Sequence, residues 1–138
     1  MIPIRPILLR HFVAYNAEHK KAFKLAARHF LKHLFRHLAQ PGSLAALEGE
    51  IRWNEGGIAV SGEATLHMDD LYVQISESYI AGGYFVVMYR SCKSNTDCCG
   101  NQNNFVRLSN LLTQEGQDRF INHCKALQAA EQARRRAP

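Results

Sequence analysis

The chain has 138 residues, a length that suits one compact domain and leaves no room for a catalytic domain with a separate partner domain. Apolar residues make up 46% of it and charged residues 21%, a balance that excludes an intrinsically disordered protein. The formal net charge is +5, but residues 1–39 carry +7, residues 40–79 carry −6 and residues 80–138 carry +4. The basic first segment therefore either pairs with the acidic second segment or faces an anionic partner.

The first residues lack the pattern of a secretory signal, because two prolines and then Arg10 and His11 interrupt their apolar run. No stretch approaches the ~20 apolar residues of a membrane span. Without an export signal, the four cysteines are expected to be free thiols in a reducing compartment. We therefore expect a cytoplasmic protein that does not associate with membranes.

Residues 17–39 are predicted to form an amphipathic helix. Asn16 is its expected N-cap, and Pro41-Gly42 is expected to end it. For residues 6–15 both a helix and an extended segment remain open. At helical spacing the apolar side chains of the predicted helix fall within a sector of about 100°; they are Phe23, Ala27, Phe30, Leu31, Leu34 and Leu38.

The sequence then changes to a period of two residues, which is typical of β-strands. Asp69-Asp70 is a predicted turn, and the segment 84–92 is apolar on both faces, as in a central strand. The segment 105–108 could add a short fifth strand. The four main strands are predicted at residues 47–53, 58–68, 71–76 and 84–92.

A polar loop over 93–104 separates these strands from a second helix at 114–133, and the tail Arg134–Arg136 is expected to be frayed. The whole chain is predicted to be one α+β domain: an antiparallel four- to five-stranded meander packed against a long basic N-terminal helix and a C-terminal helix. Its parts are an N-terminal helical segment at 1–40, the sheet at 47–108 and the helix at 114–133.

Four basic residues recur every four positions along the first predicted helix, from Lys24 to Arg36, and with Lys21 beside them they form a line that we call the cation stripe. A line of cations can track the phosphates of a nucleic acid, because each contact releases counterions. The alternative is a solvated helix face whose cations pair with Glu48, Glu50 and Glu63 of the neighbouring sheet. The stripe consists of Lys21, Lys24, Arg28, Lys32 and Arg36.

His29, His33 and His37 form a second line on the same helix. Two histidines four residues apart can share a metal ion. Phe30, however, stands where the zinc-protease motif has glutamate, and the flanking cations oppose a metal ion. We therefore favour surface histidines that add positive charge at mildly acidic pH.

Four cysteines offer a second metal hypothesis, a structural zinc site held by Cys92, Cys98, Cys99 and Cys124. Their spacing matches no standard zinc finger or ribbon, and the prediction is that the protein has no metal or other cofactor. His123 and Cys124 are adjacent on the second helix and point about 100° apart, so they form no ready catalytic dyad.

Two polar or aromatic groups could contact bases. The amides of residues 101–104 either bind a ligand or satisfy the backbone of their own turns. Tyr72 and Tyr84 fall on the opposite face from the predicted core, where aromatic side chains can stack on bases or simply favour a strand.

No phosphate loop, nucleophile elbow, dinucleotide fingerprint or calcium loop is present, and we predict no enzymatic activity.

These observations lead to a small non-enzymatic binding protein, first of all a nucleic-acid-binding accessory protein. An adaptor or inhibitor that binds protein, of the kind carried by mobile genetic elements, is the alternative, and a zinc-stabilised domain is a third hypothesis. A homodimer through an edge strand is compatible with either of the first two. The predicted phosphate contacts are Lys21, Lys24, Arg28, Lys32, Arg36, Arg134, Arg135 and Arg136.

Overall fold

The computed structural model describes residues 1–9, 17–39, 49–54, 62–78, 84–94, 97 and 101–137. The predicted α+β class is confirmed, and these described residues contain two α-helices, two 3₁₀ helices and five strands. In chain order these are η1 (Pro6–Leu9), α1 (Ala17–Leu38), β1 (Gly49–Asn54), β2 (Glu63–Met68), β3 (Leu71–Ser78), β4 (Tyr84–Ser91), β5 (Asn104–Arg107), η2 (Leu108–Leu111) and α3 (Gln114–Arg136).

The five strands form one antiparallel meander in the order β1-β2-β3-β4-β5. β4, the strand predicted to be central, lies between β3 and β5, while β1 and β5 are the two edges. Asp69 and Asp70 connect β2 to β3, as their pattern predicts. The predicted N-cap Asn16 and the helix-ending Pro41-Gly42 lie outside the described residues.

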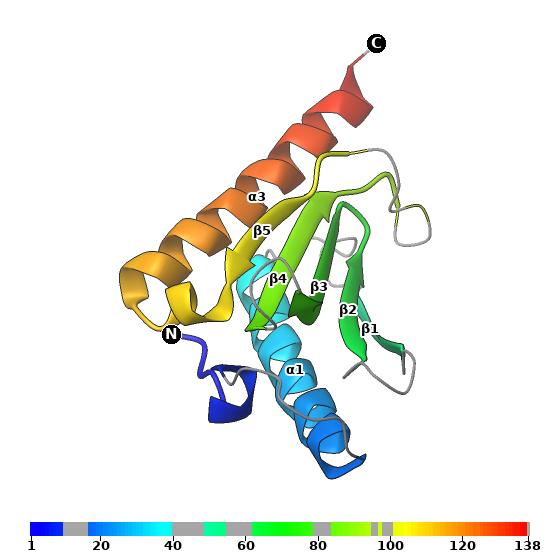
Figure 1. Cartoon of the computed structure of the whole chain (residues 1–138). Coiled ribbons are helices and arrows are strands. Elements are labelled where there is room, and N and C mark those ends of the chain that lie inside the picture. The colour runs from blue at the N-terminus through cyan, green and yellow to red at the C-terminus, as the bar shows by residue number, and fades with distance from the viewer. Residues whose placement is uncertain are drawn as a thin grey trace.

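Both helices pack on the same face of the sheet (Figure 1). The period-two pattern explains this, because alternate residues such as Ile51, Leu66 and Val73 share one face across the register. Phe23 of α1 stacks on Phe85 of β4 with ring centroids 4.4 Å apart. Residues of α1, α3 and the sheet thus form one core cluster.

The C-terminal helix differs from the prediction, because α3 continues to Arg136 and the tail is not frayed. Arg135 holds it: this side chain donates to the Asp69 carboxylate at 2.7 Å and to the backbone carbonyls of Cys92 and Lys93. Gln128 donates to the nearly buried carboxylate of Asp70 at 2.9 Å. The β2–β3 turn therefore supplies contacts that the sequence of the tail alone does not reveal.

Candidate functional site

The cation stripe lies along one side of α1. Lys21, Arg28, Lys32 and Arg36 are exposed, and Lys24 is half-buried, with its Nζ 5.5 Å from the centroid of the Trp53 ring. The structure therefore brings together all five stripe residues that the sequence singled out. The stripe lies next to β1, an edge strand of the sheet. Trp53, near the end of β1, contacts the beginning of α1.

A cavity of about 350 Å³ lies between the stripe and the edge strand, and we call it the α1–β1 crevice. Three stripe cations form its charged side, and its other side is apolar. Its lining residues are Arg28, Lys32, Phe35, Arg36, Gly49, Ile51 and Leu66.

Phe35 on the α1 side of the crevice meets Gly49 on the β1 side, and neither residue was among the predicted site residues. A Cβ added at Gly49 would lie 2.5 Å from Cε2 of Phe35, so the absence of a side chain lets the ring rest on the β1 backbone. One feature of the sequence could have identified Phe35: it lies between Leu34 of the apolar sector and Arg36 of the stripe, at the border of the two helix faces.

The acidic residues expected to neutralise the stripe have other contacts. Glu50 pairs with Arg52 at 2.7 Å, and Glu63 accepts a hydrogen bond from Asn54. Glu48 lies outside the described residues. In the part of the chain that the structure describes, no acid forms an ion pair with a stripe residue.

The histidine line lies beside the stripe. The rings of His29 and His33 meet edge to face with centroids 4.6 Å apart. Burial lowers the pKa of His29, and the positive charges of Arg5, His33, Arg36 and Lys32 lower it further. Among the described residues no group of three or more potential ligands is placed to hold a metal ion.

The arginines at the end of α3 are separate from the stripe. Arg134 pairs with Glu131 at 2.6 Å, and Arg135 pairs with Asp69, so both have partners within the protein. Arg136 is exposed. Figure 1 shows this end of α3 and the first turns of α1 at opposite ends of the molecule.

The amide-rich segment 101–104 forms hydrogen bonds with β4. Asn101 donates to the Ser91 carbonyl at 3.0 Å and Asn104 to the Tyr89 carbonyl at 3.3 Å. Asn103 accepts from Arg90 at 2.9 Å. The bonds of Asn101 and Asn104 thus satisfy backbone carbonyls of β4, which are 10 and 15 positions away, and not only the backbone of their own turn.

The two tyrosines on the outer sheet face differ in exposure. Tyr84 is 42% exposed, with the Arg107 guanidinium 5.4 Å from its ring centroid. Tyr72 is only 8% exposed, because Arg90 lies 4.9 Å above its ring and its hydroxyl donates to Gln74. Tyr72 is therefore not an open stacking surface.

The cysteines that the structure describes do not meet. Cys124 is buried in the main core, and Cys92 is buried in a small cluster with Tyr72 and Met88. Burial raises the pKa of the Cys124 thiol, which suits an inert core side chain. Cys98 and Cys99 lie outside the described residues.

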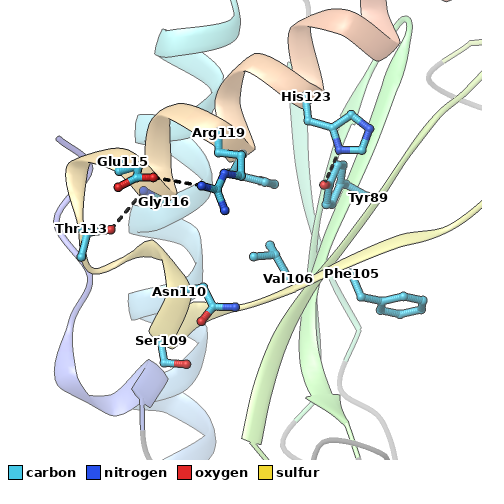
Figure 2. A pocket seen from close by; sticks show the side chains of 11 residues that line it. Tyr89, Phe105, Val106, Ser109, Asn110, Thr113, Glu115, Gly116, Arg119 and His123 are labelled. Atoms are coloured by element: carbon cyan, nitrogen blue, oxygen red, sulfur yellow. Dashed lines mark hydrogen bonds and ion pairs between the residues drawn. The ribbon is translucent and has the colours of Figure 1, made fainter.

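A larger cavity of about 700 Å³ lies between β5, η2 and the beginning of α3 (Figure 2). On one side the Tyr89 hydroxyl lies 2.7 Å from Nδ1 of His123. On the other side, Arg119 forms an ion pair with Glu115 at 3.0 Å, so the positive charge of this arginine is neutralised within the protein. Because it offers no row of unpaired cations, this cavity is a weaker candidate for a polyanion than the α1–β1 crevice.

Burial raises the pKa of Tyr89. The phenol therefore stays protonated at neutral pH and can donate to His123. This hydrogen bond joins β4 to α3 across the cavity wall, and no spacing in the sequence predicts it because its partners are 34 positions apart.

In the described segments no helix combines the length and apolar character that crossing a bilayer requires. Comparison of the chain with protein-family models, with curated proteins and with solved structures found no match to any of them.

Proposed function

We propose that the protein is a small non-enzymatic nucleic-acid-binding accessory protein whose cation stripe holds phosphates. The observation that carries the proposal is the line of five cations on α1 without an ion pair to any described acid. Like charges four residues apart on a helix repel one another, and a polyanion removes that repulsion while releasing its own counterions. A cytoplasmic location, where the free thiols Cys92 and Cys124 stay reduced, is part of the same proposal.

The test is a titration of labelled DNA and RNA with the full chain over a salt series, followed by fluorescence polarisation. Affinity is expected to fall steeply as salt rises, because bound counterions are released at each phosphate contact. The double variant Arg28→Glu/Lys32→Glu should reduce the slope of log affinity against log salt by about 1.4 to 1.8, the value for two lost contacts.

The matched control is Lys93→Glu/Lys125→Glu, which changes net charge equally at exposed positions outside the stripe. If the stripe is the binding surface, this control keeps nearly the wild-type affinity and slope. Equal losses in the two variants would mean that net charge alone attracts the nucleic acid. Absence of binding at low salt would refute the proposal.

An acidic protein partner is the competing function, because its carboxylates could pair with the same cations. Polyglutamate of matched charge distinguishes the two in the same assay. Nucleic acid is expected to bind more tightly than polyglutamate. Arginine guanidinium groups bind phosphate through two parallel hydrogen bonds, and each nucleotide also presents a base. Tighter binding of polyglutamate than of any nucleic acid would favour the adaptor.

A further inference from the structure

The α1–β1 crevice combines charge with an apolar wall. Arg28, Lys32 and Arg36 supply its charged part, while Phe35, Ile51 and the bare backbone of Gly49 supply its apolar part. A surface that only neutralised phosphates would need the cations and not the apolar wall. The crevice therefore has room for an uncharged, planar part of a ligand beside its charged part.

An aromatic side chain lies next to the stripe at each end of β1. Phe35 lies where β1 begins, and Trp53 lies near its end, where the ring contacts Phe23 and Lys24 of α1. Both rings are half-buried, so part of each remains at the surface next to the stripe. Cations with interleaved aromatic rings are the features that bind single strands, because every base has a face that can stack.

The stripe is also a single line. Residues four apart on a helix are separated by about 6 Å along its axis, so the cations form one row rather than two. β1 flanks that row, and α1 itself is held against the sheet through its apolar face. A helix that reads a duplex must instead protrude far enough to enter a groove about 12 Å wide.

We propose that the α1–β1 crevice binds single-stranded nucleic acid in preference to duplex, with phosphates on the cation stripe and a base against Phe35. This proposal rests on the proposed function and specifies its ligand. A duplex presents its phosphates but keeps its bases stacked and paired, so it gains from the stripe alone.

The experiment compares a labelled single strand of about 16 nucleotides with a duplex of the same length at equal salt. The expected result is binding about tenfold tighter for the single strand, which corresponds to one well-stacked base. Trp53 is the only tryptophan in the chain, and its fluorescence is expected to be quenched by the single strand and not by the duplex.

The variant Phe35→Leu separates stacking from charge, because it keeps an apolar side chain and removes the ring. It should weaken single-strand binding about fivefold and leave duplex binding unchanged. Phe105→Leu is the matched control, since Phe105 is a 66% exposed aromatic at the opposite edge of the sheet. Circular dichroism of each variant establishes that it is folded.

The outcomes separate the two proposals. Equal affinity for single strand and duplex, without selective quenching of Trp53, overturns the single-strand preference and leaves phosphate binding by the stripe intact. Failure of both nucleic acids to bind at low salt overturns the proposed function and this inference together. Because the quenching test uses the wild-type chain, a misfolded Phe35→Leu variant does not prevent a decision.

Discussion

Gly49 is the residue on which the shape of the α1–β1 crevice depends most directly. Its missing side chain leaves the space that the Phe35 ring occupies, at 2.5 Å from where a Cβ would stand. A methyl group there must displace the ring or the edge strand. Gly and Phe are thus a matched pair, although they are fourteen positions apart in the chain.

Gly49→Ala is expected to lower the free energy of unfolding by about 1–3 kcal/mol, the usual cost of overpacking. Urea denaturation measures the change. In a Phe35→Val background the same substitution should cost much less, because the clashing ring atoms are gone, and this double-mutant cycle is the control. Equal costs in the two backgrounds would show that the ring does not require glycine.

The pKa of His29 depends on the positive charges around the stripe. Burial and the neighbouring positive charges of Arg5, His33, Arg36 and Lys32 set its pKa below the ordinary value of 6.5. The folded state thus binds a proton less readily than the unfolded state. Its contribution to stability is present above the ordinary pKa and decreases as the pH falls through 6.5 toward the folded value.

A bound polyanion should raise the pKa of His29, because phosphates offset the charges of Lys32 and Arg36. Titration of the His29 ring protons by NMR, with and without a single-stranded oligonucleotide, measures this shift. The ring signals of His123, at the other edge of the sheet, should hardly respond to the oligonucleotide. An unchanged His29 titration in the bound state would place the phosphates elsewhere.

At the scale of elements, α3 is fixed to the β2–β3 turn by its C-terminal half. Glu131 is only 3% exposed and accepts hydrogen bonds from Arg134 and Arg135, while Arg135 also reaches Asp69. This contact explains why the helix continues to Arg136. It also commits Arg134 and Arg135 to the fold, whereas the stripe on α1 has no such acidic partner in the described residues.

Glu131 is expected to make the stability of this contact pH-dependent. Hydrogen bonds from Arg134, together with those from Arg135, lower the pKa of Glu131 below 4.5, although burial opposes the shift. The stabilisation is therefore present above 4.5 and is lost as the pH falls through the folded-state pKa. Glu131→Gln should lower Tm at pH 7, and the difference from wild type should shrink at acidic pH.

Melting curves across that pH range check the expectation, with the exposed Glu115→Gln as control. Glu115 pairs with Arg119 at the surface, where such a pair contributes little. A Tm difference for Glu131→Gln that stays constant from neutral to acidic pH would contradict a charged role for this residue.

The order and type of the two long helices and the four main strands followed from periodicity, whereas the 3₁₀ helices η1 and η2 were not predicted. Alternation over 58–68 and 71–76 predicted the strands and the buried face, and the contrast between helix-period and strand-period segments predicted the α+β class. The end of α3 was mispredicted, because Arg135 is stabilised by a turn 66 positions away. Tyr72 has the predicted parity but is covered by Arg90, a contact that only strand pairing creates.

At the scale of the whole molecule, α1, the sheet and α3 share one core cluster. Unfolding is therefore expected to be a single cooperative transition. Far-UV circular dichroism follows the helices, and Trp53 fluorescence follows the contact between α1 and β1. The two urea curves should coincide, and separate midpoints would mean that the α1–β1 half unfolds independently of α3.

The sequence by itself determined the element types, the faces that are buried and the presence of five cations on one side of a helix, because these depend on spacing along the chain. It left open whether those cations meet the acidic strand segment. For the described acids the structure decided that, because Glu50 pairs with Arg52 on the same strand and folding places α1 beside the edge strand β1. The crevice with Phe35 and Gly49 exists for the same reason: its two walls come from segments that only the packed fold brings into contact.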